Sequence, residues 1–407
     1  MQGALRREIL LSMSGAENDS GYTIKNLFTR DFVFSFLSLF GFLSAIYALF
    51  PTLPIYLEKL DFSVREIGIV IGVYGVSSLA FRFVVGGALL RYSEKKIMMA
   101  GSLLSLISFI ASVVFRSFWP FFIIRFLQGV ALATIDTAAL AFVIKVMPQT
   151  HRGQGMGYFL LAPTFALAVA PSFGMWLVNH YDFTTLFLAC AGFSVCTFLF
   201  SWQLKKDETV SPEADTTAQQ GLFFESKVIV PAMTNFLQSF VWGAISAFFP
   251  LYAVKCGILN PGYFFTAIAV MLLLGRTIGG RILDLCSKEK MILTVLAMYM
   301  IVMVVLSFSR SLPLFIFAGL FWGTGSAFFY PATIAYTLEY AGSSSGTAVG
   351  TVRAIMDFGM ALGPVVMGAV LPLIDYRAMF LCLAFICLAD LAYFEFYVKR
   401  GRAEKAP

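Results

Sequence analysis

Long apolar runs, separated by short polar breaks, extend over most of the chain. Most runs reach the ~20 residues that an α-helix needs to cross the ~30 Å hydrocarbon core of a membrane. The breaks contain charged residues, Gly, Pro or Ser. We therefore expect an all-α membrane protein. The pattern predicts twelve transmembrane helices, at residues 31–57, 64–90, 97–115, 118–146, 153–179, 182–204, 228–255, 261–285, 289–308, 311–339, 344–372 and 376–398.

The two halves of the chain share a sequence pattern. The stretch RFVVGGALLRYSEKK (82–96) returns 194 residues later as RTIGGRILDLCSKEK (276–290). Each half also contains six of the predicted helices. Parallel repeats of this kind are one of the recurring plans of membrane transporters, with the substrate site between the repeats. We therefore expect two pseudo-symmetric six-helix bundles, at residues 31–204 and 228–398, that enclose a transport site.

The polar segments outside these bundles predict how the chain is oriented. Residues 1–30 contain no continuous apolar stretch, so we expect no cleavable signal peptide. Residues 205–227 are hydrophilic and are expected to form a linker, and residues 399–407 a short tail. With both termini on one side, 18 Lys and Arg residues lie on that side, 6 on the other and 5 within helices. This bias predicts cytoplasmic termini, linker and tail.

Composition excludes several classes of protein. The chain is 59% hydrophobic and 13% charged, with a mean hydropathy of +0.83, far from the balance of a soluble domain. The net charge of +6 is scattered between apolar runs, which does not indicate nucleic-acid binding. The six cysteines form no CxxC pair, and we expect small buried apolar side chains rather than a zinc or redox site. There is no phosphate-binding loop, and His151 and His180 lie at loop ends. We expect neither an enzyme nor a cofactor.

Several short motifs are similar to those of the major facilitator superfamily. That family has the pattern R-x-x-x-G-x-x-x-D-R-x-G-R-K between its second and third helices. The matching residues are Arg82, Gly86, Arg91 and Lys95 in the first copy and Arg276, Gly280, Asp284 and Lys288 in the second. Leu90 replaces the Asp in the first copy. The resemblance implies that these residues form a charged latch on the cytoplasmic side.

Three further motifs strengthen the resemblance, which covers about residues 31 to 398. RFLQGVA (125–131) is similar to the family's R-x-x-Q-G-x-G. APSFG (170–174) is a weakened form of the G-P-x-x-G-G motif of exporters, and Gly363 and Pro364 keep the corresponding motif in the second copy. The resemblance implies the family's fold and a drug/metabolite:proton antiporter-like activity. Pro171, Gly363 and Pro364 would allow helices to bend or approach closely.

Several charged residues fall within predicted spans, where a charge costs ~2.5–3.5 kcal/mol and usually faces a cavity or a partner. Of the charged residues in the predicted spans, the most informative four are Arg125, Asp136, Arg353 and Asp357. Arg353 and Asp357 are four residues apart and can pair on one helix face. Asp136 lies ~16 Å along the helix from Arg125, too far to touch it. We expect these four residues to carry proton coupling, with the role of Arg125 implied by the resemblance.

Other interpretations of the charged residues stay open. Arg353 and Asp357 could form a static pair that braces their helix, and Asp136 could be no more than a packed polar residue. Asp390 and Glu395 are expected to be peripheral, because the resemblance implies that the last helix of each half supports the cavity rather than lining it.

The seventh predicted helix has Asn235, Gln238 and Trp242 on one face, at spacings of three and four. These side chains could bind a partly polar, aromatic ligand, or the amides could instead form hydrogen bonds between helices. By repeat position Gln128 corresponds to Trp322, and Asp136 to Tyr330. The predicted substrate cavity contains Tyr47, Gln128, Asn235, Gln238, Trp242, Trp322 and Tyr330.

The leading hypothesis is a proton-driven exporter of a small lipophilic or amphiphilic compound, with protons, the substrate and membrane lipid as its partners. We expect a monomer in a bacterial inner membrane. One alternative is a proton-coupled or facilitative importer of an organic anion or sugar. Another is a lipid flippase, or a membrane receptor that no longer transports.

Overall fold

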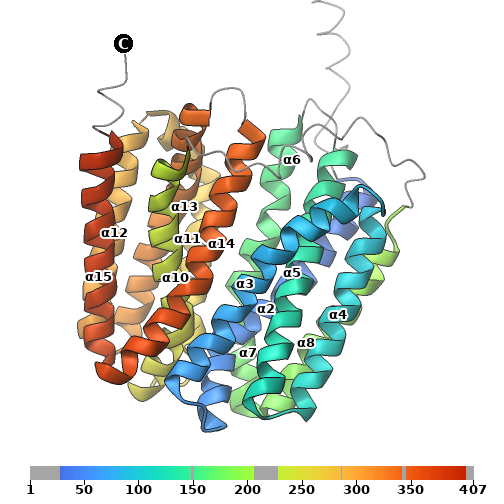
Figure 1. Ribbon diagram of the computed structural model, residues 1–407, viewed down its shortest axis with the longest axis horizontal. Helices are drawn as coiled ribbons and strands as arrows, with labels where there is room; N and C mark the ends of the chain where they lie inside the picture. The colour runs from blue at the N-terminus through green and yellow to red at the C-terminus, as the bar shows by residue number, and fades with distance from the viewer. Residues whose placement is uncertain (1–27, 148–150, 206–227, 286, 342–344, 400–407) are drawn as a thin grey trace, which may run out of the picture.

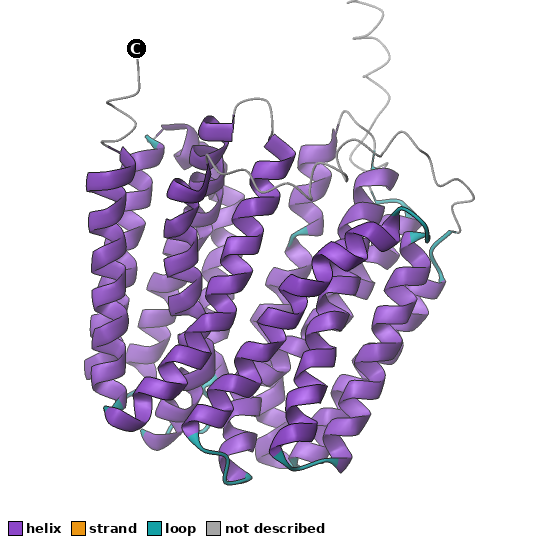
Figure 2. Ribbon diagram, viewed as in Figure 1, coloured by secondary structure: helices purple, strands orange, loops and turns teal. Residues whose placement is uncertain are grey.

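The computed structural model describes residues 28–147, 151–205, 228–285, 287–341 and 345–399. Within these ranges the protein consists of long helices and short loops, without a strand (Figure 2). The predicted linker and both terminal segments lie almost entirely outside the described residues.

The helices follow the predicted spans closely. Eleven helical spans of the described part are long and apolar enough to cross a membrane, and α11, with 24 residues, is the twelfth. The predicted all-α, twelve-helix membrane fold is confirmed. The helices are α2 (Arg30–Lys59), α3 (Val64–Leu89), α4 (Glu94–Val114), α5 (Phe118–Val146), α6 (Arg152–Phe159), α7 (Leu161–His180), α8 (Phe183–Trp202), α10 (Ile229–Lys255), α11 (Gly262–Leu285), α12 (Lys288–Phe308), α13 (Leu312–Ala341), α14 (Ser345–Val370) and α15 (Tyr376–Tyr393), with short turns at Leu371–Leu373 and Phe394–Lys399.

One predicted span is divided. The helix expected at 153–179 is α6 followed by α7, and the break falls at Leu160. Pro163 has no N–H to donate to the carbonyl of Phe159, so the helical hydrogen-bond ladder is interrupted there. The two pieces still cross the membrane as one span.

Local sequence sets where several helices begin and turn. Ser63 and Glu66 form a capping box at the start of α3, and Asp182 and Asp375 cap α8 and α15. The sequence repeat is also visible in the backbone. The turn after α2 contains Asp61 at φ 60°, and the corresponding turn after α10 contains Gly257 at φ 82°.

Successive spans run in opposite directions, so the loops lie on two faces (Figure 1). We call the face where α2 begins the terminal face, at the top of Figure 1, and the other the opposite face. Helices α2, α3, α4, α5, α7 and α8 pack on one another, and so do α10 to α15. The two groups meet where α3 packs on α14, α7 on α11 and α2 on α10.

These group-to-group contacts are tight toward the opposite face. A Cβ atom added at Gly72 of α3 would lie 2.6 Å from the carbonyl oxygen of Ala361 in α14. One added at Gly262 of α11 would lie 2.7 Å from the backbone of Pro171 in α7. Toward the terminal face α3 and α14 diverge (Figure 1). The structure is therefore closed at the opposite face.

Candidate functional site: a charge network and a cavity between two helix groups

Four charged side chains from three helices form one network between the two helix groups. The Arg82 guanidinium in α3 donates hydrogen bonds to Asp136 of α5, at 2.9 Å, and to Asp357 of α14, at 2.8 Å. Arg353 of α14 donates to the same Asp136 carboxylate oxygen at 3.3 Å. Tyr330 of α13 lies close to Arg353. Two carboxylates and two guanidinium groups therefore balance each other's charge.

The network crosses from one helix group to the other. Arg82 and Asp136 belong to the first group, and Arg353 and Asp357 to the second. The hydrogen bonds Arg82–Asp357 and Arg353–Asp136 therefore join the groups, whereas Arg82–Asp136 lies within the first group. Arg353 and Asp357, which the sequence places on one helix face, each pair across the interface.

The network lies between the middle of the spans and the terminal face. Asp136 is ten residues from the end of α5, or ~15 Å from the terminal face. The side chains of Arg82, Asp136 and Asp357 are about one-fifth exposed. That of Arg353 is 41% exposed. Arg353 is therefore the member of the network most accessible to solvent.

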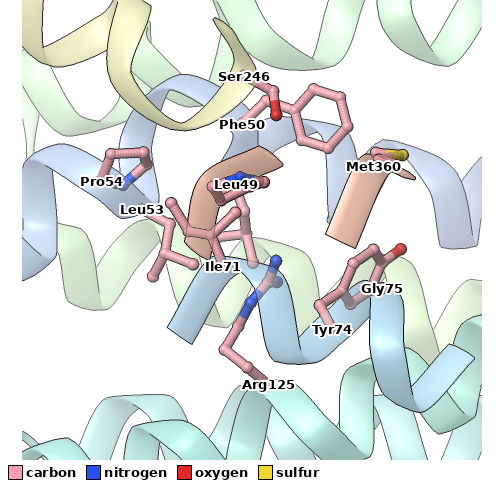
Figure 3. A pocket seen from close by; sticks show the side chains of 11 residues that line it. Leu49, Phe50, Leu53, Pro54, Ile71, Tyr74, Gly75, Arg125, Ser246 and Met360 are labelled. Carbon is pink, nitrogen blue, oxygen red and sulfur yellow. The ribbon is translucent and has the colours of Figure 1, made fainter. Parts of the chain in front are cut away.

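A small cavity lies on the other side of the network, toward the opposite face. Its volume is about 30 Å³, and both helix groups contribute to its wall (Figure 3). Its lining residues are Leu49, Phe50, Leu53 and Pro54 of α2, Ile71, Tyr74 and Gly75 of α3, Arg125 of α5, Ser246 of α10, and Met360 and Pro364 of α14. The walls are mainly apolar.

Arg125 supplies the charge in this cavity. Its guanidinium donates to Gln128 Oε1 at 2.8 Å and lies over the ring of Tyr74, 4.5 Å from the ring centre. Arg125 is 5% exposed and Gln128 is 1% exposed. Figure 3 shows the guanidinium extending from α5 between Ile71 and Tyr74. Arg125 is about 16 Å along α5 from Asp136, so the cation and the network are two separate charged sites.

Aromatic side chains lie beside the cavity in the first helix group and stack on one another in the second. The Tyr47 ring lies 4.9 Å from that of Phe50, a lining residue. In the second group Trp242 stacks on Trp322 at 6.1 Å, and Trp322 stacks on Tyr299 at 4.1 Å. Neither tryptophan lines the cavity in this conformation.

A comparison with known families decides what kind of protein carries these sites. The model of the Major Facilitator Superfamily matches residues 35–276 and 261–407. This chain belongs to the major facilitator superfamily. It is therefore a multi-pass membrane transporter of small molecules and not an enzyme, as the sequence motifs predicted.

Named relatives of this transporter include an export protein and a multidrug resistance protein. The staphylopine export protein of Staphylococcus aureus is 25% identical over 362 residues, 84% of this chain and 89% of the relative. The multidrug resistance protein MdtG of Klebsiella pneumoniae is 24% identical over 375 residues, 87% of this chain and 90% of the relative.

Solved structures of other transporters share the fold. The nucleoside transporter NupG superposes with a TM-score of 0.73 at 15% identity, covering 91% of this chain and 100% of that one. The human organic anion transporter MFSD10 superposes with a TM-score of 0.66 at 17% identity, covering 89% and 98%.

The predicted latch residues of this transporter lie in different places. Arg82 is in the charge network, whereas Arg91 is exposed and Gly86 has open space around its Cα. Arg276, Gly280 and Asp284 are in α11, at positions whose surroundings fall outside the described part of the chain. The predicted hinge residues lie at helix contacts: Pro171 faces Gly262, Gly363 faces the carbonyl of Phe240, and Pro364 faces Gly68.

Two predicted cavity residues point away from the cavity. Asn235 Oδ1 accepts a hydrogen bond from Thr333 of α13 at 2.9 Å, and Gln238 Nε2 donates to Asp390 of α15 at 2.6 Å. Both amides are buried inside the second helix group. The geometry corresponds to the alternative interpretation of these amides, hydrogen bonds between helices, because their face of α10 is turned toward α13 and α15.

Asp390 does not line the cavity and accepts a hydrogen bond from Gln238 inside the second helix group. It is fully buried, and none of the ion pairs between described residues includes it. Its Oδ1 is buried and lies near the hydroxyl of Thr234. An unpaired buried carboxylate is costly, so we expect a neutral acid whose O–H can turn toward Thr234.

Substitutions at this buried pair test that expectation. Asp390→Asn keeps a neutral acceptor for Gln238, so unfolding in detergent should change by less than about 1 kcal/mol. Gln238→Leu leaves the acid without its donor and should cost about 1–3 kcal/mol. The double variant Gln238→Leu/Asp390→Leu, which removes both polar groups, should be more stable than Gln238→Leu alone. If Asp390→Asn lowers the free energy of unfolding as much as Gln238→Leu does, the expectation that Asp390 is neutral is wrong.

Metal binding finds no support in the described ranges, where no group of three or more His, Cys, Asp or Glu side chains could hold an ion.

The sequence did not reveal Tyr74 as a cavity residue, or Arg82 as the bridge between Asp136 and Asp357. A signal for both existed in α3, where Gly68, Gly72 and Gly75 recur at spacings of four and three. Such small-residue spacing marks a face on which another helix packs closely.

Proposed function

We propose that this transporter is a proton-driven exporter of a small lipophilic or amphiphilic compound, working by alternating access. The observation that carries the proposal is the charge network of Arg82, Asp136, Arg353 and Asp357, because it contains two carboxyl groups whose surroundings depend on how the two helix groups are placed. The name of the staphylopine export protein supports the direction of transport.

The network can couple proton binding to movement. In this conformation each carboxylate accepts a hydrogen bond from a guanidinium group that balances its charge. If α14 moves away from α3 and α5, Asp357 loses Arg82 and Asp136 loses Arg353. A carboxyl group that loses a cation in a membrane interior binds a proton more readily. Proton binding and separation of the helix groups therefore favour each other.

We further propose how the protein is placed and moves. Residues 31–204 and 228–398 would be the two moving units, joined by the linker 205–227. The protein would work as a monomer in a bacterial inner membrane, with both termini in the cytoplasm. The terminal face would then be cytoplasmic, and the conformation closed at the opposite face would be one that loads substrate from inside the cell.

Transport measured with and without a pH gradient tests the proposal. Everted membrane vesicles that contain the protein would be supplied with radiolabelled anionic, cationic and neutral amphiphiles. We expect at least one compound to accumulate when the vesicle interior is acidic, and accumulation to collapse when the gradient is dissipated. Flux that is indifferent to the gradient for every transported compound would reject proton coupling. Uptake in right-side-out vesicles driven by an acidic exterior would reject export.

A further inference from the structure

Arg125 is a buried cation without a buried anion beside it. None of the ion pairs between described residues includes Arg125. Its neighbours are neutral: the amide oxygen of Gln128 and the ring face of Tyr74. The acid on the same helix, Asp136, is about 16 Å along α5 and already accepts from Arg82 and Arg353.

The hydrogen-bonding capacity of this guanidinium is also incomplete. An arginine carries five N–H donors in a planar fork that matches a carboxylate. One donor is used by Gln128, and the buried Nε–H of Arg125 has no partner. Leaving a charged group buried and unpaired costs several kcal/mol, because neither water nor an opposite charge replaces its hydration. The site is therefore unsatisfied as it stands.

The surroundings of Arg125 indicate what would satisfy it. The guanidinium lines the wall of the 30 Å³ cavity, which is large enough for water molecules but not for a substrate (Figure 3). Leu49, Leu53 and Ile71 form an apolar wall beside it. Met360 and Ser246 come from the other helix group, so the cavity widens when the groups separate. A ligand with one anionic group and an apolar body would match both the charge and the walls.

We propose that Arg125 anchors a carboxylate, or an anion of similar geometry, on the transported compound, with Tyr74 and Gln128 holding the guanidinium in place. The inference rests on the proposed transport of a small amphiphile through this cavity, and it specifies that the amphiphile is anionic. Arg125 and the charge network then have different tasks: the first binds substrate, and the second binds protons.

Matched ligand pairs test the anchor at equilibrium, without a pH gradient. The probes are benzoate, phenylacetate, indole-3-acetate and octanoate, each compared with its uncharged carboxamide. Binding to the purified full-length protein would be followed by thermal stabilisation and calorimetry. For at least one pair we expect the carboxylate to bind about tenfold more tightly than the amide, and Arg125→Gln to remove that preference. The amide's affinity should stay within about twofold, since it does not use the charge.

Two further variants separate anchoring from folding. Arg125→Lys keeps a positive charge without the planar fork, and should retain part of the preference. Arg65→Gln removes an exposed arginine at the start of α3 and should leave the preference unchanged. The proposal is wrong if no carboxylate binds better than its amide, or if Arg125→Gln weakens both members of a pair equally. It is also wrong if Arg125→Lys and Arg125→Gln both fail to fold while the wild-type protein shows no preference.

The outcome also distinguishes this inference from the proposed function. Asp136→Asn should keep the preference for the carboxylate, because Asp136 does not contact Arg125. A preference that depends on Arg125, in a protein whose flux ignores the pH gradient, would leave the anion site standing and reject proton coupling. Gradient-driven flux in a protein that shows no preference for the carboxylate would support proton coupling and reject the anion site.

Discussion

Replacing Asp136 by Asn should reduce the rate of proton-driven transport by about 100-fold, equivalent to an activation free energy about 2.7 kcal/mol higher for the coupled step. Asp136 is the acid that accepts from both arginines of the network, at 2.9 Å from Arg82 and 3.3 Å from Arg353. An amide has a similar shape but cannot bind and release a proton. Accumulation in everted vesicles with an acidic interior should fall to background, whereas exchange of labelled for unlabelled substrate without a gradient should persist.

A double variant shows whether the loss comes from the missing proton or from an unbalanced charge. Asp136→Asn leaves the network with two cations and one anion. Adding Arg353→Gln leaves one cation and one anion, so the charges balance again, but the carboxyl group of Asp136 is still absent. We expect the double variant to remain uncoupled. Recovery of gradient-driven transport in it would show that Asp136 serves charge balance only. Asp61→Asn is a matched control, because Asp61 is exposed in the turn after α2 and its positive φ suits Asn.

A disulfide between positions 172 and 266 should stop transport almost completely and reversibly. The hydroxyl oxygens of Ser172 in α7 and Thr266 in α11 are 2.8 Å apart, and they lie on different helix groups near the closed opposite face. This proximity is close to what two cysteine sulfurs need to form a bond. Ser172→Cys/Thr266→Cys, made in a background without the native cysteines, would lock that face shut. Oxidation should lower flux to about 5% or less of the wild-type value, and a reducing agent should restore it.

A second cysteine pair controls for the chemistry of cross-linking. Ser105 of α4 and Ser194 of α8 have hydroxyl oxygens 2.9 Å apart, but both helices belong to the first group. Ser105→Cys/Ser194→Cys should therefore form a disulfide and still transport. Full transport by the oxidised 172–266 pair, with the bond confirmed by mass spectrometry, would exclude alternating access through opening of this face. Equal inhibition by both pairs would show that any cross-link disturbs the protein.

The predicted spans were accurate because their physical cause is local. A membrane helix needs about 20 apolar residues, and this requirement can be read along the chain. Boundaries differed where backbone chemistry intervened: Pro163 divides the fifth span, and α4 begins at Glu94, three residues before the predicted start. The intramembrane charges Asp136, Arg353 and Asp357 were also found from sequence, since a charge inside an apolar run is conspicuous.

The pairing of those charges was not predictable. Arg82 and Asp357 are 275 residues apart, and their contact depends on which face α3 turns toward α14. Both helices are apolar nearly all round, because lipid and protein interior are about equally apolar. Hydrophobic pattern therefore does not show which face is inside. For the same reason the sequence left open whether Asn235 and Gln238 face the cavity or bond to other helices, and it did not show that Gln238 contacts the buried acid Asp390.

The sequence by itself determined that this protein is a two-fold repeated, twelve-helix membrane transporter, because span length, repeat and motifs are all properties of contiguous residues. The tertiary structure alone decided that Arg82 bridges Asp136 and Asp357, and that Arg125 lines a cavity without a paired anion. Those facts depend on the rotation and contact of helices far apart in the chain, which set the distance between charges. In a medium of low polarity, this distance determines whether a charge is balanced by an opposite charge of the protein or is left to be balanced by a ligand.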